Sequence, residues 1–192
     1  MEGRPMDHKD KKVALFLADG FEEVEALTVV DILRRAGITC QMVSIKNNDT
    51  SVISSHNVWI TADVSIGSIC FDDYDMLVLP GGMPGTKNLA SCSTLTDGLR
   101  SFYAYGKEIA AICAAPTILA GLGFLRGVRA TCYPGMESQM DGAILTHEAA
   151  VVSGNIITGR GVGCAIPFAL KIVEHYLGAS EADKISAGIV YK

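Results

Sequence analysis

Short runs of apolar residues, each bounded by charged residues or glycines, recur along the chain. The clearest examples are 13–18 (VALFLA), 39–45 (TCQMVSI), 74–82 (YDMLVLPGG) and 108–113 (EIAAIC). A continuous apolar run of this length is typical of a strand that is buried on both faces, as in a parallel sheet. We therefore predict central strands at these four positions.

Amphipathic segments lie between and after these runs. Residues 21–37 carry apolar side chains at spacings of three and four, acidic side chains at the start and two arginines near the end, with Gly37 available as a C-cap. Further helices are predicted at 93–106, capped by Ser93 or Thr94, and at 114–123, 165–178 and 180–190. A strand, a helix and a strand in succession form a βαβ unit, whose two strands are parallel.

Three other segments have the pattern of short strands and turns. They are 51–66, with a turn near His56, 129–135, and 149–161, with a hairpin turn around Gly154. The order of all these elements predicts an α/β fold with a mostly parallel, doubly wound sheet.

The chain of 192 residues, 49% hydrophobic and 19% charged, has the composition of a globular protein. It contains no internal repeat and no linker, so we predict a single domain over residues 12–192. Residues 1–11 are polar and predict a flexible N-terminal tail. This tail lacks the apolar core of a secretory signal peptide.

The formal net charge of −5 argues against nucleic acid as a partner. No stretch approaches the ~20 apolar residues that a membrane span needs, which argues against a membrane partner. The six cysteines include neither a C-x-x-C motif nor a Cys/His pair with zinc spacing. We therefore expect a cytoplasmic protein with free thiols and without a metal site.

Cys113 is the first candidate for chemistry, because it lies where the strand 108–113 meets the following helix. A sharp turn at such a junction presents its side chain above the sheet, as in the nucleophile elbow of hydrolases. We expect the positive end of the helix, starting near Ala114, to lower the pKa of the thiol. The alternative is a packed core cysteine that is inert to iodoacetamide in the folded protein.

The ends of two other strands supply further candidates. In open α/β sheets, sites gather at the carboxyl ends of the strands. Glu25 follows the first strand, and a carboxyl held against a sulfur has a raised pKa and can move protons. Glu22 and Glu23 are expected to be solvated in the first turn of the helix. Gly82 follows the third strand, and its N–H is a candidate oxyanion donor.

Two other possibilities have less support from the sequence. The segment 159–163 (GRGVG) lacks the lysine and the spacing of a phosphate-binding loop, so no nucleotide cofactor is predicted. His56 is expected in a turn and His175 on a polar helix face, and only His147 is a candidate partner for Cys113. A Cys-His hydrolase is therefore poorly supported. Cys132 is a candidate to line the same pocket as its neighbour Tyr133, whereas the other cysteines are expected to be structural.

Taken together, the motifs resemble the ThiJ/PfpI superfamily, in particular the branch of the Parkinson-disease-associated protein deglycase and bacterial ThiJ-like proteins. The motifs that carry the resemblance are LADGFEEVEALTVVDILRRAG, DMLVLPGGMPG, AAICAAPTILAGLG, ATCYPG and NIITGRGVG, in the order of the family, and they extend over residues 12 to about 190. The resemblance implies a flavodoxin-like three-layer sandwich and a homodimer.

The resemblance also assigns roles to particular residues. It implies an oxidisable nucleophile at Cys113, a carboxylic acid hydrogen-bonded to its sulfur at Glu25, and oxyanion donors at the backbone of Gly82 and Ala114. It places Arg35 and Val24, both on the first helix, at the dimer interface.

Two positions depart from the pattern of the family. The protease-like branch has a histidine directly after the cysteine, where this chain has Ala114. The deglycase branch commonly has a histidine before the proline at the end of the strand, where this chain has Tyr133. A tyrosine can donate a hydrogen bond to a bound carbonyl but is a poor base near neutral pH.

Three functions remain open at this stage. The first is a cofactor-free glyoxalase or deglycase, in which Cys113 adds to methylglyoxal, glyoxal or an early adduct on a glycated protein and Glu25 moves protons. The second is a redox sensor or chaperone, in which Cys113 is oxidised to a sulfinate. The third, a cysteine peptidase or amidase, is disfavoured by Ala114.

Overall fold

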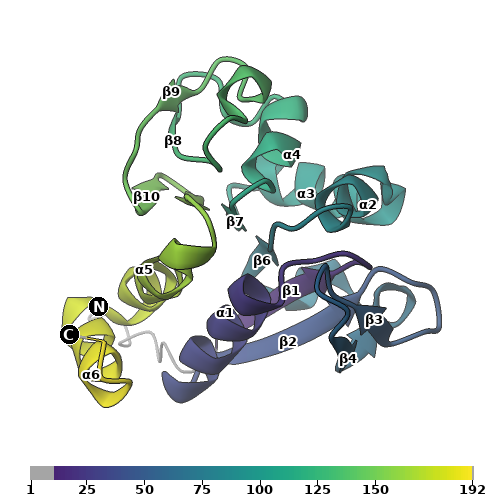
Figure 1. The fold of residues 1–192 in the computed structure, drawn as a ribbon, viewed down its shortest axis with the longest axis horizontal. Coiled ribbons are helices and arrows are strands. Elements are labelled where there is room, and N and C mark those ends of the chain that lie inside the picture. Colours follow the sequence, from purple (N-terminus) through teal and green to yellow (C-terminus); the bar gives the residue numbers. More distant parts are fainter. Residues whose placement is uncertain (1–10, 192) are drawn as a thin grey trace, which may run out of the picture.

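A seven-stranded sheet runs through the centre of the protein, shown as a computed structural model that describes residues 11–191 (Figure 1). The strands lie in the order β10–β11–β7–β6–β1–β2–β5. All neighbours are parallel except β10 and β11, which form an antiparallel hairpin at one edge. Their bounds are Lys12–Leu17 (β1), Thr39–Ser44 (β2), Val64–Ser65 (β5), Met76–Leu79 (β6), Glu108–Ile112 (β7), Ala150–Ser153 (β10) and Ile156–Gly159 (β11).

Helices cover both faces of this sheet. Successive strand residues point to opposite sides, and both sides are apolar, so each face needs a covering layer. Val13, Leu15 and Leu17 of β1 pack into one apolar core, whereas Ala14 and Phe16 pack into the other. The first core is closed by α1 (Glu23–Arg35), α5 (Ala165–Leu177) and α6 (Ala179–Gly188), and the second by α2 (Gly85–Ser91), α3 (Ser93–Ala104) and α4 (Pro116–Gly121). The predicted three-layer, flavodoxin-like α/β architecture is confirmed.

The four predicted central strands, the predicted helices and the hairpin around Gly154 are all present, with shifts at their ends. The helix expected from Ala114 begins at Pro116, and α3 is capped by Cys92 rather than by Ser93 or Thr94. The helix α2 was not predicted, since a seven-residue helix is too short to show a helical period. Residues 1–10 of the predicted tail lie outside the described residues.

Four short strands form two further small sheets. They are β3 (Ser51–Ile53) paired antiparallel with β4 (Trp59–Thr61), and β8 (Arg129–Ala130) paired parallel with β9 (Ile144–Leu145). The β3–β4 pair confirms the two short strands predicted around His56. Within residues 11–191, no helix is long and apolar enough to cross a membrane.

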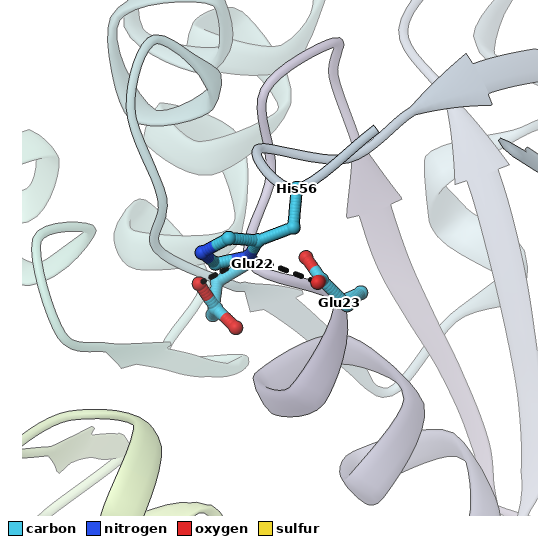
Figure 2. Close-up of side chains that lie close together, drawn as sticks. All are labelled: Glu22, Glu23 and His56. Atoms are coloured by element: carbon cyan, nitrogen blue, oxygen red, sulfur yellow. Dashed lines mark ion pairs between the residues drawn. The ribbon is translucent and has the colours of Figure 1, made fainter. Parts of the chain in front are cut away.

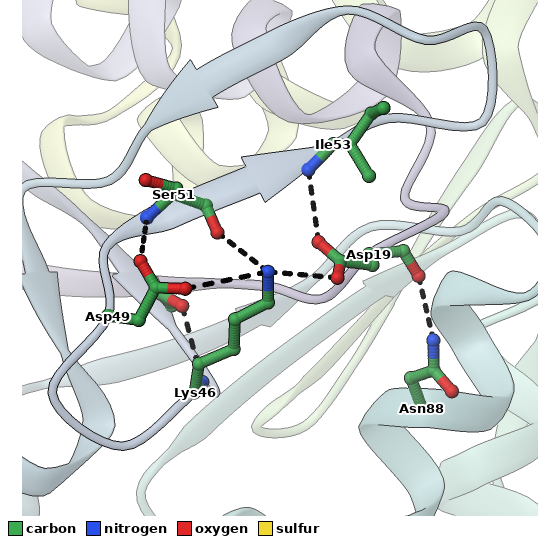
Figure 3. A network of polar contacts seen from close by, with 7 residues as sticks. Asp19, Lys46, Asp49, Ser51, Ile53 and Asn88 are labelled. Atoms are coloured by element: carbon green, nitrogen blue, oxygen red, sulfur yellow. Dashed lines mark hydrogen bonds and ion pairs between the residues drawn. The ribbon is translucent and has the colours of Figure 1, made fainter.

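Polar contacts fasten the β3–β4 hairpin to the loop that follows β1 (Figure 3). The side chain of Asp19 accepts hydrogen bonds from the Ile53 N–H at 3.0 Å and from Lys46 Nζ at 2.9 Å. Lys46 also donates to the Ser51 carbonyl at 2.8 Å, and Asn88 donates to the Asp19 carbonyl at 2.8 Å. These contacts place the turn that carries His56 beside the start of α1.

One ion pair links a helix to the sheet in a way that depends on pH. His175 of α5 lies with Nε2 3.1 Å from Glu108 Oε1 at the start of β7, and this hydrogen bond is the main cause of the raised pKa of His175. The folded protein therefore binds this proton more tightly than the unfolded chain. The pair stabilises the fold fully below the ordinary histidine pKa of about 6.5, and its contribution is lost as the pH rises through the higher pKa of the folded state.

We expect His175→Gln to lower the melting temperature more at pH 6 than at pH 9, in thermal unfolding followed by circular dichroism. His147→Gln is the matched control, because His147 is exposed and lies away from this pair. An equal loss of stability at both pH values would contradict the assignment.

Candidate active site

The carboxyl ends of three neighbouring strands supply the candidate site. Because β6 lies between β1 and β7, the segments that follow these strands meet at one edge of the sheet. They contribute Glu25 in the first turn of α1, Gly81 and Gly82 after β6, and Cys113 directly after β7. Strand order also reverses here, since β1 pairs with β2 on one side and with β6 on the other, which is the usual place for a site in an open α/β sheet.

Cys113 forms a sharp turn with unusual backbone geometry. Its φ of 65° lies in the left-handed region, which costs a residue other than glycine about 1–3 kcal/mol. Two backbone hydrogen bonds hold it there. The Cys113 N–H donates to the Gly159 carbonyl at 2.9 Å, and its carbonyl accepts from the Tyr133 N–H at 2.8 Å. The sulfur is thereby presented at the end of the sheet.

A cavity of about 650 Å³ opens above Cys113. Its walls are mainly apolar, with three charged or titratable side chains besides the thiol and the phenol. It is lined by Glu22, Glu25, His56, Gly82, Met83, Cys113, Ala114, Tyr133, Pro134, Gly135, Met136 and Val162. The structure thus brings together Cys113, Glu25, Gly82, Ala114 and Tyr133, which the sequence singled out separately.

Glu25 is fully buried, and its carboxyl lies beside the sulfur of Cys113. Oε2 accepts a hydrogen bond from the Gly81 N–H at 2.8 Å. Burial raises the pKa of Glu25 to about 7, with a further contribution from the charge of Glu22, although hydrogen bonds from Gly81 and Cys113 act in the opposite direction. The carboxyl can therefore gain and lose a proton near neutral pH.

The thiol of Cys113 has a raised pKa of about 12, whereas the sequence predicted a lowered one. Burial is the main cause, followed by the nearby Glu25 carboxylate. Backbone hydrogen bonds from the N–H groups of Ala114 and Gly82 oppose this increase. The prediction was wrong because α4 begins only at Pro116 and because an acidic side chain, not a cation, adjoins the sulfur. The thiol must lose its proton during a reaction, and Glu25 is placed to accept it.

His56 is a further pocket residue, and its place in the site was missed from the sequence. Its Nδ1 lies 2.9 Å from Glu23 Oε1 and 3.8 Å from Glu22 Oε2 (Figure 2). The expectation that Glu22 and Glu23 are solvated was wrong, since their side chains are only 14% and 15% exposed. The hairpin turn covers them, and a contact between segments 30 residues apart leaves no local signal in the sequence.

The same three side chains are the group in residues 11–191 whose spacing would suit a metal ion. Their nearest nitrogen and oxygen atoms all lie within 4.8 Å of one another. His56 and Glu23 already satisfy each other as an ion pair. Burial raises the pKa of Glu23, but a hydrogen bond from its own backbone N–H, followed by the contact with His56, brings the pKa below its ordinary value.

The remaining candidates lie elsewhere. His147 is exposed and shares a 3.0 Å hydrogen bond with Arg160, outside the residues that line the cavity. Cys132 is buried in the core on the α3–α4 face, so it does not line the cavity as its neighbour Tyr133 does. All six cysteines are free, as expected. Val24 is 49% exposed, and Arg35 is exposed and paired with Asp31 at 2.7 Å.

Known proteins share both the sequence pattern and the fold. The DJ-1/PfpI family matches residues 11–175. Protein dj-1beta of Drosophila melanogaster is 38% identical, over 94% of this chain and 97% of its own. The glutathione-independent glyoxalase DJR-1.2 of Caenorhabditis elegans is 31% identical, over 91% of this chain and 94% of its own. The solved structure of oxidized Toxoplasma gondii DJ-1 superimposes with a TM-score of 0.89 at 36% identity, covering 94% of this chain and 98% of that one.

The raised pKa of Glu25 implies that its burial destabilises the fold at neutral pH. Between its ordinary pKa near 4.5 and the folded value of about 7, the folded protein binds more protons than the unfolded chain. Stability linked to this group is therefore present at pH 4.5 and lost as the pH rises to 7. We expect the melting temperature of Glu25→Gln to rise relative to that of the wild type as the pH increases from 4.5 to 7.5, because the amide does not ionise. A difference that does not vary with pH would contradict the raised pKa.

Gly81 is required because a side chain at this position would collide with Cys113 and Glu25. A Cβ at this position would lie 2.7 Å from Cys113 Cβ and 2.9 Å from Glu25 Oε2. We expect Gly81→Ala to destabilise the protein by about 1–3 kcal/mol in urea unfolding and to change the rate of alkylation of Cys113 by iodoacetamide. Gly121→Ala, where nothing lies within 4 Å, is the control and should leave both quantities close to wild type.

Proposed function

The chain belongs to the DJ-1/PfpI family, and on this premise we propose that it is a cofactor-independent glyoxalase or deglycase. Its substrates would be methylglyoxal, glyoxal or early glycation adducts on proteins. The observation that carries the proposal is the buried Glu25 carboxyl beside the Cys113 sulfur, with a pKa of about 7. The C. elegans relative named as a glutathione-independent glyoxalase supports the same reaction class.

The first step is addition of sulfur to the aldehyde. As the Cys113 sulfur forms a bond to the aldehyde carbon, the Glu25 carboxylate accepts the thiol proton and delivers it to the former aldehyde oxygen. The result is a hemithioacetal, and the carboxylate is regenerated. The N–H groups of Gly82 and Ala114, which point at the sulfur, stabilise the negative charge on the sulfur as its proton leaves.

The second step moves hydrogen between the two carbons. Glu25 removes the proton from the carbon bonded to sulfur, which gives an enediol, and returns it to the neighbouring carbon. The product is a thioester of lactate or glycolate, which water hydrolyses to release the acid and the thiol. A carboxyl with a pKa near the working pH suits both transfers, because it can act as base and then as acid.

We further propose a cytoplasmic homodimer, with Val24 and Arg35 at its interface. The exposure of Val24, an apolar residue on the solvent side of α1, supports this placement. A cysteine peptidase has less support, because Ala114 follows Cys113 and no histidine in residues 11–191 hydrogen-bonds to the sulfur.

A redox sensor or chaperone is the second candidate, and the same contacts favour it. A sulfinate at Cys113 would accept hydrogen bonds from the Gly82 and Ala114 N–H groups and from a protonated Glu25. The structural similarity to the oxidized T. gondii protein agrees with this possibility.

The two candidates differ in turnover. We expect the wild-type protein to consume many equivalents of methylglyoxal with formation of lactate, and Cys113→Ser and Glu25→Gln each to lower kcat by at least about 100-fold. Loss of methylglyoxal and release of lactate are measured in parallel by absorbance and by a lactate assay. A single equivalent consumed as a stable adduct, with Cys113 still oxidised by peroxide to a sulfinate in mass spectra, would exclude the enzyme and favour the sensor.

A further inference from the structure

The proposed reaction also needs a group that exchanges protons with the substrate oxygens. Glu25 handles the protons on sulfur and carbon, but the enediol forms only if the second carbonyl oxygen receives a proton as the carbon–hydrogen bond breaks. Tyr133 lies in the cavity, yet a phenol is a weak acid near neutral pH and gives up its proton to a carbonyl oxygen less readily than an imidazolium does. The chemistry therefore requires another acid and base at the cavity wall.

His56 is the histidine that lines this cavity in residues 11–191. It comes from the β3–β4 hairpin, far in sequence from Cys113 and Tyr133. Its side chain is 66% exposed, so it lies at the mouth rather than in the buried floor formed by Glu25. A substrate bound to the sulfur would extend from Cys113 toward this mouth.

The two ring nitrogens of His56 have different surroundings. Nδ1 faces Glu23 Oε1 at 2.9 Å and Glu22 Oε2 at 3.8 Å (Figure 2). Ser55 Oγ lies 3.3 Å from the same nitrogen. No group in residues 11–191 makes a hydrogen bond with Nε2, which leaves this nitrogen for a ligand. A carboxylate at Nδ1 fixes the orientation of an imidazole and favours its charged form during proton transfer, as in the catalytic triads of hydrolases.

The hairpin that carries His56 is hydrogen-bonded to the loop that follows β1. The Ser55 N–H donates to the Phe21 carbonyl at 2.8 Å, and the Gly20 N–H donates to the Ile53 carbonyl at 2.8 Å. The side-chain contacts of Asp19 and Lys46 reinforce these bonds (Figure 3). The hairpin that carries His56 and the helix that carries Glu25 are therefore joined through the same short segment after β1.

We propose that His56 is the acid and base that serves the substrate oxygens in the Cys113 cavity, an inference that rests on the proposed glyoxalase function. As Glu25 removes the proton from the carbon bonded to sulfur, the protonated His56 donates its Nε2 proton to the neighbouring carbonyl oxygen, giving the enediol. Neutral His56 then takes the hydroxyl proton from the oxygen on the carbon bonded to sulfur. Glu25 returns its proton to the other carbon, so both residues are restored and the thioester is formed.

The electrostatic surroundings keep His56 charged at the start of this cycle. The hydrogen bond with Glu23 is the main cause of its raised pKa, and the charges of Glu23 and Glu22 add to it. Across the cavity, the titratable groups are Glu25, Cys113 and Tyr133. Because the protonated imidazole is the donor, activity that depends on it should decline at alkaline pH.

The decisive experiment compares His56→Ala with wild type and with the control His147→Ala, using methylglyoxal as the substrate. We expect His56→Ala to lower kcat by at least about 100-fold with KM changed less than twofold, and His147→Ala to behave as wild type. Added imidazole should restore part of the activity of His56→Ala, since the vacated site opens to solvent. The rate of alkylation of Cys113 by iodoacetamide should stay within twofold of wild type, which shows that the site is folded.

Two further variants separate proton transfer from a structural role. His56→Arg keeps a cation next to Glu23 but cannot exchange protons near neutral pH, so we expect it to be as inactive as His56→Ala. Glu23→Gln removes the main cause of the raised pKa and should move the alkaline limb of the kcat profile to lower pH. Full activity in His56→Arg, or in His56→Ala, would overturn the assignment while leaving the glyoxalase function intact. Absence of turnover in the wild-type protein would overturn both.

Discussion

The burial of the Glu25 carboxyl against the Cys113 sulfur is the constraint on which the site depends. Two acidic groups held together away from water disfavour each other's charge, so each keeps its proton to a higher pH than it would in solvent. The raised pKa of the thiol does not prevent chemistry, because the neighbouring carboxyl titrates near pH 7 and can remove the thiol proton at the moment of attack. The Glu25 carboxylate thus takes the role of proton acceptor that the imidazole has in a Cys-His pair.

The fold supplies the support that this unfavourable contact needs. Three parallel strands end side by side, so segments from distant parts of the chain meet without long loops. Cys113 holds a strained backbone conformation because Gly159 and Tyr133 bind its N–H and carbonyl. Gly81 lets the backbone approach Cys113 and the Glu25 carboxyl closely, where even a methyl group would collide. The apolar cores on both faces of the sheet stabilise the protein against the local cost at its edge.

The mouth of the cavity has a different construction from its floor. Glu25 is buried in the floor, whereas Glu22, Glu23 and His56 form a partly exposed cluster where a hairpin crosses the start of α1. This cluster brings an imidazole to the cavity that Tyr133 also lines. A proton-transferring group can therefore be supplied from a different segment, provided that it reaches the same volume. The polar contacts of Asp19 hold the hairpin in place (Figure 3). His56 of this hairpin lines the cavity.

The sequence by itself determined the central strands, the principal helices, the hairpin around Gly154 and the three loops that would carry the site, because apolar periodicity and glycine-rich strand ends are local properties of the chain. The same motifs singled out Cys113, Glu25 and Gly82, and the resemblance to a known family added Ala114 and Tyr133. Only the tertiary structure decided the direction of the thiol pKa and the place of His56. A pKa reflects burial and neighbouring charge, and His56 enters the site through contacts with Glu22 and Glu23, more than 30 residues away in the sequence. Such long-range contacts follow no periodicity and no fixed spacing along the chain, so a single sequence does not reveal them and they form only when the chain folds.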